Sequence, residues 1–312
     1  RRGFTTVRDV GGADFGLARA VEEGLIRSPR LIYCGKALSQ TGGHGDVRGP
    51  GYEAYDAAYS QPGLGFICDG VPAVRRAARS EIRRGAHFIK IMGGGGISSP
   101  TDRITSDQFS EEEIAAVVEE AEMANLYVAV HAYTARSVKR CVRLGVRSIE
   151  HGNLADDEAI QLMKEKGAFL VPTLAIYRAL VEEGVAAGLP EELVAKTYEV
   201  LDAGIQAVEK AYRAGVPMAY GTDLLGIMHR RQLSEFILRA EVVKPVDLIR
   251  AATINGARLL RRESELGLIA PGYRADLIVV DGNPLDDIKI MADPERSPKL
   301  VMKDGNLLVR EL

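Results

Sequence analysis

The chain has 312 residues, of which 46% are hydrophobic and 27% charged, and its formal net charge is −3. This length can bury one or two large cores, and the composition is that of a globular protein. The near-neutral charge, without a basic stripe, excludes a nucleic-acid binder that relies on bulk electrostatics. No apolar run approaches the roughly 18 residues of a membrane span, so we also expect no membrane partner.

Three cysteines, Cys34, Cys68 and Cys141, are widely spaced and form no Cys-x-x-Cys pair. An odd, scattered set argues against a disulfide framework and against a zinc ribbon. We therefore expect buried thiols and a cytoplasmic location, unless a segment upstream of Arg1 carried a signal peptide.

Short β-branched runs alternate with longer helical stretches along most of the chain. Strands are predicted at 4–10, 30–34, 87–92, 126–131, 146–151, 168–172 and 216–221. Helices are predicted at 14–24, 71–84, 110–124, 134–144, 156–166, 190–214, 231–242 and 245–261. Strands that alternate with helices pack as parallel βαβ units. We therefore predict an α/β fold, a (β/α)8 TIM-like barrel over residues 1–262 that holds strands 2–8 and lacks strand 1.

One alternative fold and two further regions bear on this fold prediction. A doubly wound open sheet is the alternative, but no G-x-G-x-x-G turn with a later ribose-binding acid marks a dinucleotide site. The glycine-rich stretch over 39–69 is too long for an ordinary connection, which is typical of functional or disordered loops. Residues 263–312 change to short strands with Asp-Gly-Asn-type turns, which predicts the C-terminal part of a small β-sandwich side domain.

Four polar residues close or nearly close apolar strands, namely Lys90, His131, His151 and Asp223. In a parallel barrel the carboxyl ends of the strands meet at one face, so these side chains should converge. Imidazoles and a carboxylate suit zinc or a similar divalent ion. Burial of Lys90 should lower its pKa, and a neutral amine can react with carbon dioxide to give a carbamate with two anionic oxygens.

Each of these residues also has a structural interpretation. A strand-end histidine is often a core residue, a lone lysine is often solvated, and an aspartate after a strand often caps the next helix. Agreement of all four positions favours a shared site. The Gly93–Gly96 run could instead cradle a phosphate, but no G-K-[ST] follows it.

The ordered set of motifs resembles the amidohydrolase superfamily, and within it the imidazolonepropionase-like and prolidase-like enzymes. The matching segments lie at 3–9, 88–91, 130–133, 149–152, 220–223, 251–257, 267–269 and 272–279. The resemblance implies that Lys90 is carboxylated and bridges two metals, most simply Zn²⁺. It also implies that His131 and His151 bind the second metal, and that Asp223 binds the first and handles the proton.

The family also has a His-x-His pair at the end of the first barrel strand and a leading β segment. This sequence contains no His-x-His. We therefore expect a chain that lacks roughly the first hundred residues of a complete barrel with its side unit. Two ligands of the first metal are then missing.

The resemblance implies hydrolysis of an amide or peptide bond by metal-activated water, as in a dipeptidase, a prolidase or an N-acyl amino acid hydrolase. Asp223 is the predicted proton carrier and His44 the predicted stabiliser of the oxyanion. Tyr133 is predicted to hold the substrate carboxylate, and Arg103 is a further candidate for anion contact. A small cyclic amide is the alternative substrate. A metal-deficient binding or assembly module is the alternative class, and a homo-oligomer is expected by resemblance.

Overall fold

A computed structural model describes residues 2–49 and 64–310 of the chain. Its strands are β1 (Thr6–Asp9), β2 (Arg30–Tyr33), β3 (Ala37–Ser39), β4 (Gly65–Ile67), β5 (Ile89–Met92), β6 (Val128–Thr134), β7 (Ser148–Leu154), β8 (Phe169–Val171), β9 (Leu277–Val279), β10 (Leu300–Lys303) and β11 (Asn306–Arg310). The α-helices are α1 (Phe15–Glu22), α2 (Val71–Arg83), α3 (Glu111–Met123), α4 (Ala135–Arg143), α5 (Asp157–Lys166), α6 (Leu174–Glu183), α7 (Glu191–Lys196), α8 (Leu201–Ala214), α9 (Ser234–Arg239), α10 (Pro245–Ala252) and α11 (Ile254–Leu259).

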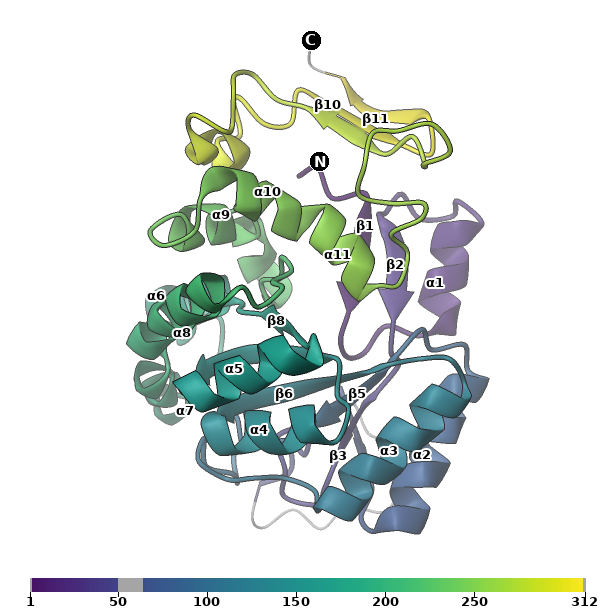
Figure 1. Ribbon diagram of the computed structural model, residues 1–312, viewed down its shortest axis with the longest axis vertical. Helices are drawn as coiled ribbons and strands as arrows, with labels where there is room; N and C mark the ends of the chain where they lie inside the picture. The colour runs from purple at the N-terminus through teal and green to yellow at the C-terminus, as the bar shows by residue number, and fades with distance from the viewer. Residues whose placement is uncertain (1, 50–63, 311–312) are drawn as a thin grey trace.

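A parallel sheet forms the centre of the molecule, with strand order β4-β3-β5-β6-β7-β8. A separate parallel pair, β1 and β2, stands beside it (Figure 1). The central strands read as continuous apolar runs because helices cover them, and every residue of β5 is buried. These strands confirm the predicted α/β class with parallel pairing, and closure of an eightfold barrel stays a prediction.

Capping residues mark the ends of two helices as the sequence predicts. Ser110 and Glu113 form the predicted capping box at the start of α3. Asp156 caps α5 through the backbone N–H of Ala159, and Gly167 ends that helix in the left-handed conformation. Such short, well-defined connections hold the carboxyl ends of successive strands in register.

The tail forms a three-stranded antiparallel sheet in the order β11-β10-β9. It lies at one end of the molecule beside the N-terminal strands (Figure 1). Arg30 on β2 contacts Asp276 at 2.9 Å and Asp304 at 2.6 Å, which ties this sheet to the parallel strands. The antiparallel tail is confirmed, whereas the boundary between residues 262 and 263 stays a prediction.

Several element predictions differ from the structure. The predicted helix over 245–261 is divided at Thr253 into α10 and α11. The predicted helix over 190–214 is divided into α7 and α8 by a 3-10 turn at Thr197–Glu199. The helix α6 was not predicted, because its apolar residues continue directly from the strand before it. Residues 216–221 form only a bridge between Met218 and Leu170, since Pro217 has no N–H to donate to a ladder.

Three further observations bear on the sequence predictions. Cys34, Cys68 and Cys141 are buried free thiols, as predicted. Among the described residues, no helix is both long enough and apolar enough to cross a membrane. The predicted long loop over 39–69 begins at the last residue of β3 and includes β4. Residues 50–63 of this loop lie outside the described residues.

Candidate active site

The two strand-end histidines and Lys90 come together on adjacent strands. Met92 of β5 pairs with His131 of β6, and Ala132 of β6 pairs with His151 of β7. The rings of His131 and His151 are 4.7 Å apart between centroids. Lys90, His131 and His151 are 3%, 2% and 5% exposed, so the cluster is removed from bulk water.

Hydrogen bonds fix how the two imidazoles are presented. His131 Nε2 lies 3.0 Å from the carbonyl oxygen of Gly95. A carbonyl only accepts, so Nε2 carries the proton and Nδ1 carries the lone pair. His151 Nδ1 lies 2.7 Å from Thr173 Oγ1, which leaves Nε2 as the nitrogen without this contact. Burial lowers the pKa of both rings well below its ordinary value, and neighbouring Lys90 lowers it further, so both imidazoles are neutral.

The amine of Lys90 is buried among the residues that the structure describes. Burial lowers its pKa, against the opposing effect of Glu150 and Asp223. Glu150 is already occupied, because Arg8 Nη2 donates to its two oxygens at 2.7 and 2.8 Å. No ion pair joins Lys90 to any residue in the described ranges. Burial therefore shifts Lys90 toward the neutral amine, which is the form that can become a carbamate.

Three residues of the candidate site, one within β7 and two after the strands, adopt a backbone conformation that is unusual for side chains with a Cβ. The φ angles of His151, Thr173 and Asp223 are 78°, 52° and 53°. For the β-branched Thr173 this left-handed conformation is a genuine outlier. Such strain persists where the surroundings over-determine it, which is common at functional sites. All three residues belong to the same face of the parallel strands.

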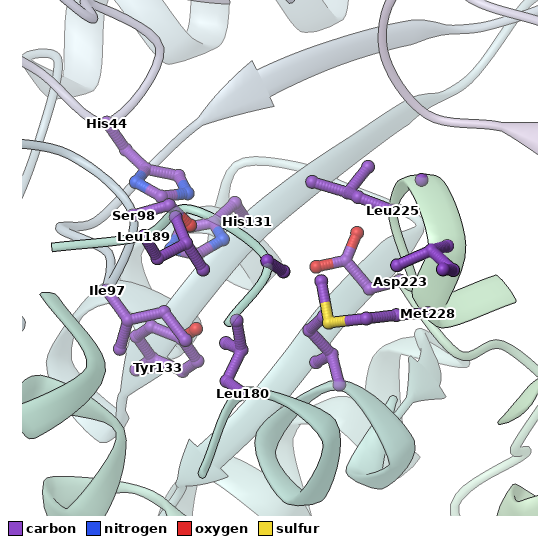
Figure 2. Close-up of a pocket in the computed structure, with 14 residues that line it drawn as sticks. His44, Ile97, Ser98, His131, Tyr133, Leu180, Leu189, Asp223, Leu225 and Met228 are labelled. Carbon is purple, nitrogen blue, oxygen red and sulfur yellow. The ribbon is translucent and has the colours of Figure 1, made fainter. Parts of the chain in front are cut away.

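A cavity of about 250 Å³ opens at this face. Figure 2 shows His44, His131 and Tyr133 on one side and Asp223 with Met228 on the other. The apolar part of its wall consists of Ile97, Ile176, Leu180, Ala187, Leu189, Leu225, Ile227 and Met228. Among the described residues that line it, Asp223 supplies the single carboxylate, and none is a lysine or arginine.

Asp223 faces this cavity and is accessible to solvent there. The surrounding protein nevertheless removes enough water to raise the pKa of its carboxyl to about 6, against the pull of Lys90 in the other direction. A carboxyl with a pKa near neutrality can both accept and release a proton under ordinary conditions. The geometry thus suits the proton carrier that the sequence predicted.

The remaining predicted residues divide into two groups. Tyr133 is 2% exposed, lines the cavity, and packs edge-on against His131 with centroids 4.7 Å apart. His44 also lines the cavity and stacks on His131 at 4.1 Å. Arg103 is exposed and is not among the residues that line the cavity. The structure therefore brings six predicted residues together and leaves Arg103 outside the group.

The Gly93–Gly96 run is engaged with the protein and does not form a phosphate cradle. The N–H groups of Gly93 and Gly95 donate to the carbonyls of His131 and Ser106, and that of Gly96 donates to the carboxylate of Asp102. A Cβ at Gly95 would come within 1.8 Å of the Arg103 carbonyl oxygen. These glycines permit close packing of the loop after β5.

Sequence reasoning missed Thr173, although it follows a predicted strand as the other site residues do. Its hydroxyl contacts His151, and its 3% exposure places it inside the cluster. The signal that could have found it is the polar residue directly after the apolar run Phe169–Val171 and Pro172. A threonine there is common in turns, so sequence alone gives it little weight.

The ligand types in the cluster fit a divalent cation. Two neutral imidazoles lie side by side, and each has one nitrogen turned away from its protein contact. Across residues 2–49 and 64–310, however, no three His, Cys, Asp or Glu side chains lie close enough to hold a metal alone. A cation at His131 and His151 therefore needs a ligand of another type, which the carbamate of Lys90 would supply.

One wall of the cavity depends on a buried carboxyl group from α9. Glu235 is fully buried, and its Oε2 accepts a hydrogen bond from the N–H of Ala175 at 2.8 Å, in the first turn of α6. Burial raises the pKa of Glu235 to about 7, against the effect of Arg239. Because α6 carries Ile176 and Leu180, this contact helps to hold the apolar wall in place.

The raised pKa of Glu235 predicts a pH dependence of stability. The folded chain binds this proton more tightly than the unfolded chain does, so the proton stabilises the fold. This stabilisation is complete below the ordinary pKa of glutamate and is lost as the pH rises through about 7. Between about pH 5 and about pH 8, the free energy of unfolding should fall by roughly 2 to 3 kcal/mol more in the wild type than in Glu235→Gln. Denaturant unfolding at both pH values measures this difference. The exposed Glu192→Gln is the control, and equal falls in all three proteins would contradict the prediction.

Comparison with known proteins places the chain in a family. The model of the amidohydrolase family matches residues 1–308, so the chain belongs to the amidohydrolase family. The solved structure of a prolidase complexed with N-methylphosphonate-L-proline is 50% identical, with a TM-score of 0.97, and the match covers 99% of this chain and 76% of that one. The parallel strands of the present chain match those of amidohydrolase TIM-barrel structures.

Two further relatives have similar coverage. A Xaa-Pro dipeptidase with methionine bound in its active site is 36% identical, with a TM-score of 0.89, over 99% of this chain and 76% of that one. Ochratoxinase from Aspergillus niger is 36% identical over 317 residues, which cover 98% of this chain and 66% of the relative. The chain thus spans about two thirds of the length of this curated relative.

Proposed function

We propose that this chain carries the catalytic face of a metal-dependent amidohydrolase that cleaves a peptide bond in small apolar dipeptides, as a prolidase does. The observation that carries the proposal is the cavity itself, with Asp223 on one wall and His44 and His131 on the other. Its volume of about 250 Å³ suits a small molecule and excludes a folded polypeptide. The similarity to a prolidase and to a Xaa-Pro dipeptidase supports a dipeptide as the substrate.

The residues that would hold one metal ion are His131, His151 and the carbamate of Lys90. Asp223 would bind the other metal ion. A bound divalent ion, most simply zinc and in the complete site a pair of ions, polarises a scissile carbonyl and lowers the pKa of water. Asp223 takes the proton from the attacking water and passes it to the leaving nitrogen. Tyr133, which lines the cavity, binds the carboxylate end of the substrate through its hydroxyl.

The apolar wall selects the rest of the substrate. Leu180, Leu189 and Met228 offer no partner for a charge, so a charged side chain would lose its hydration there without compensation. We therefore infer a preference for an apolar residue or acyl group on the amino side of the bond. The homo-oligomeric state, the cytoplasmic location and the anion contact of Arg103 stay predictions.

A substrate panel tests this function. The chain is loaded with zinc in bicarbonate buffer and given Leu-Pro, Asp-Pro, Lys-Pro, an N-acyl amino acid and a small cyclic amide. We expect hydrolysis of Leu-Pro to exceed that of Asp-Pro and Lys-Pro. Preferred hydrolysis of the cyclic amide would move the function to an imidazolonepropionase-like reaction. No turnover by a metal-loaded chain would contradict the proposal and favour a binding or assembly module.

The role of Lys90 predicts a dependence of metal content on this residue and on carbon dioxide. Lys90→Ala should bind less than half of the metal that the wild type binds, because the carbamate oxygens are lost. Removal of bicarbonate should lower metal uptake by the wild type and leave the variant unchanged. Elemental analysis of dialysed protein measures both effects, and Lys164→Ala, at an exposed position of α5, is the control. Equal metal content in wild type and Lys90→Ala would exclude the bridging role.

A further inference from the structure

A closed ring of hydrogen bonds joins His44 to the loop that follows β5. The backbone N–H of His44 donates to Gln108 Oε1 at 2.9 Å, and Gln108 Nε2 donates to Asp102 Oδ2 at 2.8 Å. The hydroxyl of Ser99 donates to Asp102 Oδ1, and His44 Nδ1 lies 2.9 Å from Ser99 Oγ. Two chains of hydrogen bonds therefore hold His44, one at its backbone N–H and one at its ring. Both chains end at the carboxylate of Asp102.

The directions of these hydrogen bonds follow from the charge on Asp102. Its Oδ2 also faces the N–H of Gly96 at 3.1 Å, and the ammonium of Lys196 lies 3.7 Å from Oδ1. A carboxyl group surrounded by N–H donors and an ammonium is ionised and accepts only. Ser99 must then give its one proton to Asp102, so it accepts from His44. The proton of the imidazole is therefore on Nδ1, and Nε2 is the nitrogen left for a molecule in the cavity.

Two further contacts fix the loop that carries this ring. Lys196 at the end of α7 donates to the backbone carbonyls of Gly96, Ser99 and Asp102 at 3.2, 3.0 and 2.9 Å. A Cβ at Gly96 would come within 2.0 Å of His44 Nδ1 and Cε1. The imidazole thus lies against bare backbone, and only glycine leaves room for it there. Ser99, Asp102 and Gln108 are 0%, 8% and 2% exposed, so water does not compete for these hydrogen bonds.

We propose that Ser99 and Asp102 are positioning residues that hold His44 as the Nδ1–H tautomer and direct Nε2 toward the substrate. The role of His44 as a substrate contact rests on the proposed function, whereas its placement rests on the hydrogen bonds alone. With Nδ1 held by Ser99, Nε2 is the atom left to contact the substrate, as an acceptor in the neutral ring or as a donor to an oxyanion in the protonated ring.

Nitrogen NMR of the imidazoles tests the placement without any turnover. The chain has five histidines, so His44 can be assigned by the signals that disappear in His44→Gln. In the wild type we expect a proton on His44 Nδ1, because this atom donates to Ser99 Oγ. Ser99→Ala and Asp102→Asn should each replace this pattern with averaged signals of two tautomers, and Gly96→Ala should shift it by displacing the ring. Thr105→Ala, at an exposed position of the same loop, is the control.

The result that would overturn the placement is a wild-type His44 with its proton on Nε2, or a Ser99→Ala spectrum identical to that of the wild type. Circular dichroism and thermal unfolding show that each variant is folded. If Asp102→Asn unfolds, Ser99→Ala decides alone, because it removes only a hydroxyl.

A double-variant cycle then tests the consequence for catalysis. Ser99→Ala should lower kcat/KM for Leu-Pro by roughly 10- to 100-fold, as is typical of residues that orient another group. When Ser99→Ala is added to His44→Gln, kcat/KM should fall no further, because the imidazole that Ser99 positions is already absent. Losses that multiply would show an independent role and contradict the proposal. If the wild type cleaves no substrate of the panel, the proposed function fails while the NMR result still decides the placement.

Discussion

Replacement of Asp223 by asparagine is expected to lower kcat by roughly 10²- to 10⁴-fold, the usual contribution of a general acid–base residue. Asparagine has nearly the same shape but cannot accept the proton of the attacking water. The left-handed backbone at this position, with φ of 53°, is one that asparagine tolerates as well as aspartate does. The loss should therefore be chemical, and the thermal midpoint should stay close to that of the wild type.

The matched control for this prediction is Asp202→Asn on α8, at an exposed position. Its kcat for Leu-Pro should equal that of the wild type. Metal content should be measured for both variants, because Asp223 is also a proposed metal ligand. Near-normal activity of Asp223→Asn would exclude the proton-carrier role. Unchanged metal content together with lost turnover would assign Asp223 to proton transfer alone.

Replacement of Arg8 by methionine is expected to lower the free energy of unfolding by roughly 3–5 kcal/mol, the usual effect of breaking a buried ion pair. Arg8 donates to both oxygens of Glu150, and the side chains are only 10% and 4% exposed. Its other amino group donates to Ser148 Oγ at 3.2 Å. Methionine leaves the carboxylate of Glu150 buried without its partner, although it fills most of the space of the arginine stem.

The surface pair Arg19–Glu23 is the control for Arg8, because its side chains are 75% and 49% exposed. Arg19→Met should cost no more than about 0.5 kcal/mol. The double variant Arg8→Met with Glu150→Gln should be more stable than Arg8→Met alone, since no unpaired charge remains buried. Denaturant unfolding measures all of these. A cost for Arg8→Met as small as that of Arg19→Met would contradict a structural role for the pair.

The sequence predicted the parallel strands and the residues at their ends because both follow from local rules. An apolar run that ends in Lys90, His131 or His151 is visible in the chain, and parallel packing brings such ends to one face. Family resemblance then gave these residues roles. The helix α6 and the irregular stretch at residues 216–221 escaped prediction, because they depend on packing and on the missing N–H of Pro217.

The sequence by itself determined the class of fold, the order of its units and the side chains able to hold a metal, since these depend on periodicity and residue type. Only the tertiary structure decided the protonation and direction of those side chains. Arg8 and Glu150 are 142 positions apart, and His44 reaches Gln108 across 64 positions. Contacts at such separations exist only after the chain has folded, and they engage the carboxylate of Glu150 and the Nδ1 atom of His44.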